Sequence, residues 1–227
     1  MICNKIIHII IMEINKPQKI TLINNDDYNS WIYYNENFIS NHHDVYDVIK
    51  QLIPTNRHKV KIHGKFIEIP RLQLCYGRSY NYSKTSSEIS GDTPQIISQL
   101  LNIVNDHYMI MTKSNKPIYN MCLINFYRDG NDYIGFHADD EKQLVPNAPI
   151  YSISLGAIRK FRLKMKSNML NDNYATGTCG EDDIEFNLTS GSLIVMGGMC
   201  QKTHKHCVPK QKKVTEMRIN LTFRAFD

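Results

Sequence analysis

The stretch Arg218-Ile219-Asn220-Leu221-Thr222-Phe223-Arg224 decides which fold we expect for this chain. Side chains alternate between the two faces of a β-strand, so the apolar residues of this stretch point one way and its polar residues point the other. One face can pack in a core while the other presents two guanidinium groups. Planar guanidinium groups bind carboxylates through paired hydrogen bonds and keep their charge, which favours a ligand acidic at both ends, such as 2-oxoglutarate.

A second motif, His137-Ala138-Asp139, predicts a metal site when it is combined with the distant His206. Residues two apart in a strand share a face, so His137 and Asp139 can occupy adjacent positions on one metal ion. Two imidazoles and one carboxylate form the ligand set of non-haem iron(II) oxygenases, which leaves positions open for a cosubstrate and dioxygen. The sequence therefore predicts Fe(II) bound by His137, Asp139 and His206, beside a dicarboxylate site.

Each motif also has a plainer interpretation. Histidine and aspartate meet at this spacing by chance in many chains, and the Asp140 and Glu141 that follow also suit a solvated turn. His206 lies among lysines, where a histidine is usually an ordinary surface residue. Residues 218–224 alone could form an edge strand with its polar face in water. The joint occurrence of the three motifs favours the iron site.

The pattern beyond Tyr119 predicts an antiparallel barrel or jelly roll. Short alternating runs are separated by turn signals there, at residues 121–127, 150–155, 160–165, 184–188, 193–196 and 217–223. Two amphipathic helices precede them. One follows Asp44 and ends before Pro54, and the other begins at Thr93-Pro94, where a hydroxyl cap and a proline in the first turn are expected. The fold class is therefore mainly β with flanking helices.

Composition is that of a folded domain. The 227 residues are 42% hydrophobic and 22% charged, which favours one domain at residues 41–227 after an N-terminal extension at 1–40. The six cysteines form no CxxC pair, and no secretory signal is evident, so we expect an intracellular, nuclear or cytoplasmic protein. No stretch approaches the ~20 apolar residues of a membrane span, so no membrane partner is expected.

The positive charge of the chain is clustered. A net charge of +5 and a pI of about 8.8 mildly favour a polyanionic partner. Three basic clusters consist of Lys59, Lys61 and Lys65; of Lys160, Arg162, Lys164 and Lys166; and of Lys202, Lys205, Lys210, Lys212 and Lys213. Each alone is equally well explained as a solvated strand face. Because the three clusters bracket the metal motif, they favour nucleic acid.

Further short motifs occur in a fixed order over about residues 62–224. They are Pro70-Arg71-Leu72, Tyr76-Gly77, Tyr80-Asn81-Tyr82-Ser83, Asn125-Phe126-Tyr127, His137 to Glu141, Ser152 to Gly156, Gly191 to Met196, Gln201 to Lys210 and the terminal arginine motif. By these motifs the chain resembles the AlkB-type Fe(II)/2-oxoglutarate-dependent dioxygenases, and most closely their eukaryotic-type DNA-repair branch. The resemblance implies a double-stranded β-helix at about residues 119–227 with an N-terminal nucleotide-recognition lid at about 57–90.

The resemblance also implies roles for individual residues. Those expected to hold 2-oxoglutarate are Asn125, Tyr127, Arg218, Asn220, Thr222 and Arg224. Arg218 would face the distal carboxylate, and Arg224 would lie nearer the iron. Those expected to contact the substrate are His63, Gly64, Lys65, Tyr80, Tyr82, Ser83, Asp140 and Glu141. The target base would stack between His137 and Tyr82, although tyrosines at strand spacing are more often core or surface residues. Arg71 belongs to a matching motif but could be structural.

The chain departs from the family pattern in two places. Duplex-specialised relatives carry an apolar aromatic wedge on the early hairpin, where this chain has Ile62-His63-Gly64-Lys65. A single-stranded or RNA substrate therefore gains ground over duplex DNA. His204 stands where the family often has tryptophan, two residues before the last iron ligand, and adds a potential ligand near the metal.

The predicted function is oxidative removal of N-methyl groups from 1-methyladenine and 3-methylcytosine in DNA or RNA. The reaction would couple the decarboxylation of 2-oxoglutarate, with Fe(II) and dioxygen, to the release of formaldehyde, and we expect a monomer. One alternative is a 2-oxoglutarate-dependent hydroxylase of a protein side chain. Another is a zinc-stabilised nucleic-acid-binding module that uses Cys200, His204, His206 and Cys207, although one clustered set makes a poor tetrahedral cage.

Overall fold

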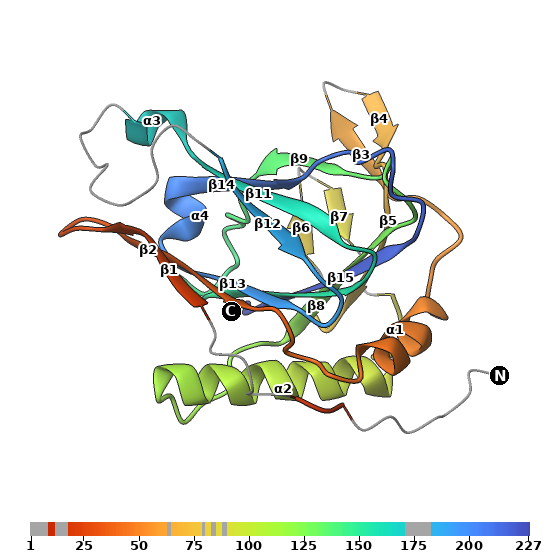
Figure 1. Ribbon diagram of the computed structural model, residues 1–227, viewed down its shortest axis with the longest axis horizontal. Coiled ribbons are helices and arrows are strands. Elements are labelled where there is room, and N and C mark those ends of the chain that lie inside the picture. Colours follow the sequence, from red (N-terminus) through yellow and green to blue (C-terminus); the bar gives the residue numbers. More distant parts are fainter. Residues whose placement is uncertain are drawn as a thin grey trace.

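Two antiparallel sheets lie face to face in the protein, which we describe from a computed structural model (Figure 1). The structure describes residues 9–11, 18–62, 65–78, 80–82, 85–87, 90–170 and 183–227. Within them, the long helix α2 (Gln95–Thr112) and the shorter α1 (His42–Lys50) cover the outer face of the larger sheet. This arrangement confirms the predicted class, mainly β with a jelly-roll core and flanking helices.

The larger sheet has seven strands in the order β1-β2-β13-β10-β15-β8-β5. In chain order these are β1 (Gln18–Asn24), β2 (Asn29–Asn35), β5 (Leu72–Tyr76), β8 (Met121–Tyr127), β10 (Ile150–Gly156), β13 (Leu193–Gly198) and β15 (Arg218–Arg224). The smaller sheet has four strands in the order β12-β11-β14-β9. They are β9 (Ile134–His137), β11 (Arg159–Met165), β12 (Ile184–Leu188) and β14 (His204–Val208).

Two short hairpins stand apart from these sheets in the pairing scheme. One joins β3 (Lys59–Ile62) to β4 (Lys65–Glu68), and the other joins β6 (Tyr80–Tyr82) to β7 (Thr85–Ser87). The β3–β4 hairpin projects from the body of the molecule (Figure 1). Both hairpins fall in the segment for which a lid role is expected.

Strand β15 is buried along its whole length, and its alternation serves two different environments. Ile219, Leu221 and Phe223 are each 0% exposed and pack in the core beneath α1 and α2. The polar residues of β15 face the space between the sheets. Because β15 pairs with β10 on one side and β8 on the other, three polar rows line up across the sheet, and Asn220 lies opposite both Ser154 and Asn125.

Residues 18–35 belong to the larger sheet, although the sequence placed residues 1–40 in a separate extension. β2 pairs with β13 along six residues, and β1 pairs with β2. An uncovered β13 edge would leave a row of backbone donors and acceptors without partners, and β2 supplies those partners. Ile32 of β2 is 0% exposed in the core between the two sheets. The domain therefore begins before residue 41.

The helix ends differ from the expected caps. α2 begins at Gln95 after Pro94, and no side-chain hydrogen bond caps it, so the expected Thr93 hydroxyl cap is wrong. α1 begins at His42, two residues before Asp44, which lies in the first turn where a negative charge is favourable. After β11 comes the short helix α3 (Ser167–Leu170), and residues 171–182 lie outside the described part. No described helix has the length and apolar character to span a membrane.

Burial of His107 predicts a pH-dependent stability. Its ring nitrogens lie 3.2 Å from the Tyr151 hydroxyl and 3.3 Å from the Tyr33 hydroxyl, and burial lowers the pKa of the imidazole. The unfolded chain therefore binds a proton more readily, so His107 reduces stability as pH falls through its ordinary value near 6.5. We expect the Tm of the wild type to drop more between pH 7 and pH 5 than that of His107→Gln.

Thermal unfolding followed by circular dichroism measures this difference. Ile110→Gln, at an exposed position of the same helix that does not titrate, is the matched control and should keep the wild-type pH dependence. An equal drop for wild type and His107→Gln would contradict the prediction.

Candidate metal and cosubstrate site

Three potential metal ligands converge at the open edge of the smaller sheet. β14 pairs with β9 so that His206 lies directly opposite His137, and Asp139 follows two residues after the end of β9. One ligand atom from each residue lies within 4.8 Å of the others. The sequence predicts that Asp139 lies in the same strand as His137, but β9 ends at His137. The irregular segment after β9, and not strand alternation, therefore brings the Asp139 carboxylate to the histidines.

The separations suit one metal ion. His137 Nε2 lies 3.7 Å from Asp139 Oδ1, and His206 Nε2 lies 3.9 Å from Asp139 Oδ2. An ion between these atoms can bond each at about 2.0–2.2 Å, the distance usual for imidazole and carboxylate ligands. His137 Nδ1 donates a hydrogen bond of 2.9 Å to the Gly135 carbonyl, which leaves Nε2 as the lone-pair donor.

Electrostatics keep the three ligands in their metal-binding forms. Burial, with His137 close by, lowers the pKa of His206 to about 3, so the imidazole is neutral at physiological pH. Burial alone would raise the pKa of the Asp139 carboxyl. Burial is the largest single effect, but the Arg224 guanidinium, 2.9 Å away, and the two histidines together outweigh it and hold that pKa well below its ordinary value. Two neutral imidazoles and one carboxylate result.

Gln201 fixes the backbone of the carboxylate ligand. The Asp139 N–H donates a hydrogen bond of 2.9 Å to Gln201 Oε1, and Gln201 Nε2 lies 3.3 Å from the sulfur of Met196. Lys166 Nζ in turn donates a hydrogen bond of 2.9 Å to the backbone carbonyl of Gln201. Gln201 belongs to the short helix α4 (Cys200–Thr203), directly before β14, so one turn of helix ties Asp139 to the strand that carries His206.

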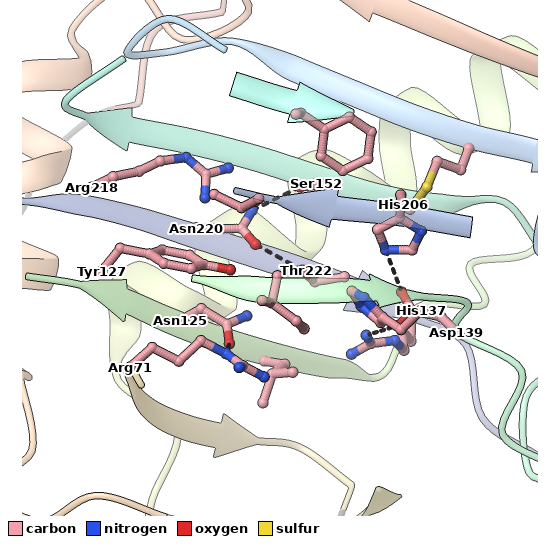
Figure 2. Close-up of a pocket in the computed structure, with 16 residues that line it drawn as sticks. Arg71, Asn125, Tyr127, His137, Asp139, Ser152, His206, Arg218, Asn220 and Thr222 are labelled. Atoms are coloured by element: carbon pink, nitrogen blue, oxygen red, sulfur yellow. Dashed lines mark hydrogen bonds and ion pairs between the residues drawn. The ribbon is translucent and has the colours of Figure 1, made fainter. Parts of the chain in front are cut away.

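One cavity joins the metal ligands to the polar rows of the larger sheet. Figure 2 shows Arg218 and Tyr127 at one end of this cavity and the three metal ligands at the other. Its apolar lining residues are Leu123, Ile134, Phe161, Met196 and Val208. These side chains form apolar walls between the Arg218 guanidinium at one end and the metal ligands at the other.

Arg218 forms the far end of the cavity and is only 1% exposed. Its Nη2 donates a hydrogen bond of 2.8 Å to Ser154 Oγ, and its guanidinium lies 5.2 Å from the centre of the Tyr127 ring. Burial lowers its pKa only to about 10, so the group stays charged at neutral pH. Among the described residues, its Nε and Nη1 have no hydrogen-bond partner.

A buried cation with two unused donors fits a carboxylate. Leaving such a group uncompensated is costly, whereas a carboxylate can accept both hydrogen bonds at once. The metal ligands at the other end of the cavity fit a chelating group. The donor set of this cavity therefore fits Fe(II) together with 2-oxoglutarate.

The remaining predicted cosubstrate residues line the same cavity, but their polar atoms are largely engaged. Asn220 Nδ2 donates to Ser152 Oγ at 2.7 Å, and Thr222 Oγ1 donates to Asn220 Oδ1 at 3.2 Å. Asn125 Oδ1 accepts hydrogen bonds from Arg71 Nε at 2.8 Å and Gln73 Nε2 at 2.7 Å. These hydrogen bonds form two sets that hold the shape of the cavity, one around Asn220 and one around Asn125 (Figure 2).

Sequence reasoning missed several lining residues. Arg71, interpreted as possibly structural, is 5% exposed, lines the cavity and bonds Asn125. Ser152 and Ser154 of β10 hold Asn220 and Arg218, and the alternation of that strand was the available signal. Gln201 begins one of the motifs that carry the resemblance but was assigned no role, because a glutamine that contacts a ligand backbone has no sequence pattern of its own.

A second cavity of about 180 Å³ adjoins the metal site and shares Asp139 with it. Asp140 and Glu141 line it, with Met199 and Lys202 on the α4 side. Burial raises the pKa of Glu141 to about 7, against the opposing effect of Arg224. The predicted substrate residues Asp140 and Glu141 therefore lie beside Asp139, one of the three potential metal ligands.

The other predicted substrate residues belong to the two hairpins. Lys65 is exposed on β4, and Tyr80 and Tyr82 lie on β6. The side chains of both tyrosines, and residues His63, Gly64 and Ser83, lie outside the described part of the structure.

The zinc-module arrangement is not formed in the described residues. The group of potential ligands found there is His137, Asp139 and His206. Cys207 follows His206 in β14 and points to the opposite face, while Cys200 is buried at the start of α4. His204, expected as an extra ligand, is 2% exposed, and its Nδ1 lies 2.7 Å from Thr203 Oγ1, outside the metal group.

Comparison with known proteins gives a family match over most of the chain. Residues 34–224 match the model of the 2OG-Fe(II) oxygenase superfamily. The DNA oxidative demethylase ALKBH2 of Arabidopsis thaliana is 34% identical over 195 residues, covering 79% of this chain and 60% of that protein. Human ALKBH2 is 34% identical over 167 residues, covering 73% of this chain and 60% of that protein.

Human alkB homolog 3, named an alpha-ketoglutarate-dependent dioxygenase, is 31% identical over 156 residues, covering 68% of this chain and 51% of that protein. The chain thus spans about 60% or less of the length of these three relatives. The predicted resemblance to AlkB-type dioxygenases is confirmed.

Solved structures share the fold. The structure of OsALKBH1 superimposes with a TM-score of 0.54 at 18% identity, covering 86% of this chain and 96% of that chain. A 2OG-Fe(II) oxygenase-family oxidoreductase from Burkholderia pseudomallei gives a TM-score of 0.52 at 17% identity, covering 83% and 80%. At these identities the likeness concerns architecture, and it agrees with the predicted β-helix.

Removal of the Gln201 side chain should weaken metal binding. Residues that orient a metal ligand typically contribute 10–100-fold to affinity, so we expect Gln201→Ala to raise the Kd for Mn²⁺ by about tenfold or more. Anaerobic calorimetry measures this Kd, and Lys202→Ala, an exposed neighbour, is the control. Equal metal affinity of Gln201→Ala and wild type would show that the contact to Asp139 does not orient the ligand.

Replacement of Arg218 by methionine should weaken cosubstrate binding and leave the metal in place. Hydrogen bonds to charged groups contribute about 1.5–3 kcal/mol, which corresponds to a rise of about 10–100-fold in the Kd for 2-oxoglutarate. Calorimetric titration of Mn²⁺-loaded protein measures it, with Arg162→Met on the outer face of β11 as the control. A Kd within twofold of the wild type would remove Arg218 from the cosubstrate site.

Proposed function

Because this chain belongs to the 2OG-Fe(II) oxygenase superfamily, we propose that it is an Fe(II)- and 2-oxoglutarate-dependent dioxygenase that removes N-methyl groups from nucleic-acid bases. The single observation that carries the proposal is one cavity with a His-Asp-His group at one end and the buried guanidinium of Arg218 at the other. This spacing of charges suits a ligand that chelates a metal through one end and is anionic at the other.

The residues of the cavity have different proposed roles. His137, Asp139 and His206 would hold Fe(II), which with 2-oxoglutarate and dioxygen supplies the oxidising equivalent. Arg218, fixed by Ser154 and placed over the Tyr127 ring, would bind the distal carboxylate. We assign Asn125, Tyr127, Asn220 and Thr222 to the walls of this cosubstrate site, with Arg224 at its metal end. The apolar walls exclude water, which strengthens each of these charge interactions.

The acidic second cavity supports a cationic substrate. Methylation at N1 of adenine or N3 of cytosine gives the base a positive charge, and Asp140 and Glu141 line the space next to Asp139. Hydroxylation of the methyl group gives an N-hydroxymethyl base, whose N–C bond breaks to release formaldehyde and restore the base. ALKBH2 relatives are named DNA oxidative demethylases, which agrees with this substrate class.

The hairpins would form the lid over the extruded base. Tyr80 and Tyr82, with His63, Gly64, Lys65 and Ser83, keep the substrate-contact role that the resemblance implies, with the base stacked between Tyr82 and His137. The stretch Ile62-His63-Gly64-Lys65 lacks the aromatic wedge of duplex-specialised relatives. We therefore propose single-stranded DNA or RNA as the preferred substrate, since a base that is already unpaired costs less to extrude.

Four cysteines of the described residues are free thiols, which agrees with action inside a reducing cell, in the nucleus or cytoplasm. We propose that the protein acts as a monomer.

Hydroxylation of a protein side chain is the competing activity for the same iron site. An assay that compares a methylated oligonucleotide with a peptide as substrate separates the two activities.

The decisive assay is formaldehyde release from a methylated oligonucleotide. We expect wild type with Fe(II), 2-oxoglutarate and dioxygen to release formaldehyde from single-stranded 1-methyladenine or 3-methylcytosine DNA or RNA. We expect His137→Ala and Asp139→Ala each to lower the rate at least about 100-fold, because each removes one of three metal ligands. Mass spectrometry of the repaired strand measures the same event independently.

The control variant is His43→Gln. His43 is an exposed histidine on α1 that does not line the cavity, so this variant should keep full activity. Full activity in His137→Ala would rule out the iron assignment. Succinate formation driven by a peptide, with none driven by the oligonucleotide, would establish the protein hydroxylase instead.

A further inference from the structure

The outer face of the smaller sheet carries a row of cations on β11. Lys160, Arg162 and Lys164 alternate along this strand with the inward-facing Phe161 and Leu163, which pack between the sheets. In the sequence these three residues, with Lys166, form one basic cluster. The structure divides it into two parts with different electrostatic surroundings.

Acidic residues neutralise the part of the row nearest β12. Lys160 Nζ lies 2.7 Å from Glu185 Oε1, and Arg162 Nη2 lies 2.9 Å from Asp183 Oδ2. Arg162 Nε also lies 3.7 Å from Glu185 Oε2. These two cations are therefore largely compensated within the protein.

The other part of the row is uncompensated. Lys164 lies directly opposite Lys205 in the register of β11 and β14, and both are exposed. Within the described residues, neither ammonium group has an acidic partner. Like charges directly opposite each other across a strand pair destabilise a sheet. The uncompensated Lys164–Lys205 pair costs stability, whereas Lys160 on the same strand is compensated by Glu185. This difference points to a ligand for the pair.

This lysine pair lies immediately behind the metal ligands. Lys205 precedes His206 in β14, and Phe136 precedes His137 in β9, the edge strand of the sheet. Lys164 Nζ lies 4.1 Å from the centre of the Phe136 ring, which holds the ammonium beside β9. The cations therefore flank the edge over which a polymer would pass to present one unit to the metal.

We infer that Lys164 and Lys205 form a phosphate-binding surface for the nucleic-acid strand whose base enters the metal site. This inference rests on the proposed function. Paired flexible ammonium groups suit a chain of phosphates, and contacts to phosphate position a strand without reading its sequence. That property suits an enzyme that must find a modified base in any sequence. Phe136 serves as the platform that fixes Lys164.

The salt dependence of strand binding tests the inference. The probe is a fluorescent, unmethylated, single-stranded twelve-nucleotide DNA, whose Kd is measured from low to moderate salt for Lys164→Gln, Lys205→Gln and the double variant. Each lysine that contacts a phosphate contributes about 0.7 to the slope of log Kd against log salt for single strands. We expect the slope to fall by about 0.7 in each single variant and by about twice that amount in the double variant.

Lys160→Gln is the matched control. It removes the same charge from the same face of the same strand, but at a lysine that Glu185 already compensates, so the slope should stay at the wild-type value. Thermal unfolding adds an independent readout. Loss of Lys205 should leave Tm unchanged or raise it, because its repulsion with Lys164 disappears.

The outcomes separate this inference from the function on which it rests. Wild-type slopes in both lysine variants would overturn the phosphate contacts, whether or not the protein demethylates. Absence of formaldehyde release by the wild type would overturn the proposed function, while the slopes still report on the surface. Equal binding of a polyglutamate peptide, lost in the same variants, would identify an acidic protein as the partner instead.

For an active enzyme, the loss of kcat/KM should grow with the length of the substrate. It should be larger for a methylated twelve-nucleotide strand than for the methylated nucleoside, which has no phosphate. An equal loss for both would indicate a structural effect of the substitutions and contradict phosphate binding.

Discussion

The pairing of β15 on both sides is the constraint on which the site depends. Because β10 and β8 lock its register, Arg218 lies beside Tyr127, and Asn220 lies beside Ser154 and Asn125. A shift of one residue would turn the arginines into the helix-covered core and the apolar residues into the cavity. The apolar face of β15 therefore fixes the position of the polar face, and packing beneath α2 becomes a condition for chemistry between the sheets.

The two arginines of β15 have different electrostatic roles. Arg224 forms an ion pair with Asp139 and keeps that ligand anionic, so part of its charge is used within the protein. Arg218 has Ser154 and the Tyr127 ring beside it, and among the described residues it forms no ion pair with an acidic group. The positive charge at the far end of the cavity is therefore the one that a ligand must balance.

Much of this arrangement could be predicted from sequence, because it rests on local patterns. Alternation in residues 218–224 predicted which side chains face the cavity, and β8 and β12 span the predicted runs from end to end. Long-range contacts could not be predicted in this way. Glu185 compensates Lys160 only because β12 pairs with β11, and β2 joins the sheet only because β13 offers it an edge. Nothing in the spacing of His137 and Asp139 reveals that the strand ends between them.

The environment of Cys200 protects its thiol from oxidation. This thiol is 2% exposed at the start of α4, next to the glutamine that orients Asp139. Burial, with the Asp139 carboxylate nearby, raises its pKa to about 12. Oxidants attack thiolates far faster than thiols, so a sulfur that keeps its proton is chemically quiet. The proposed dioxygen chemistry can thus take place beside this buried sulfur without oxidising it to sulfenic acid.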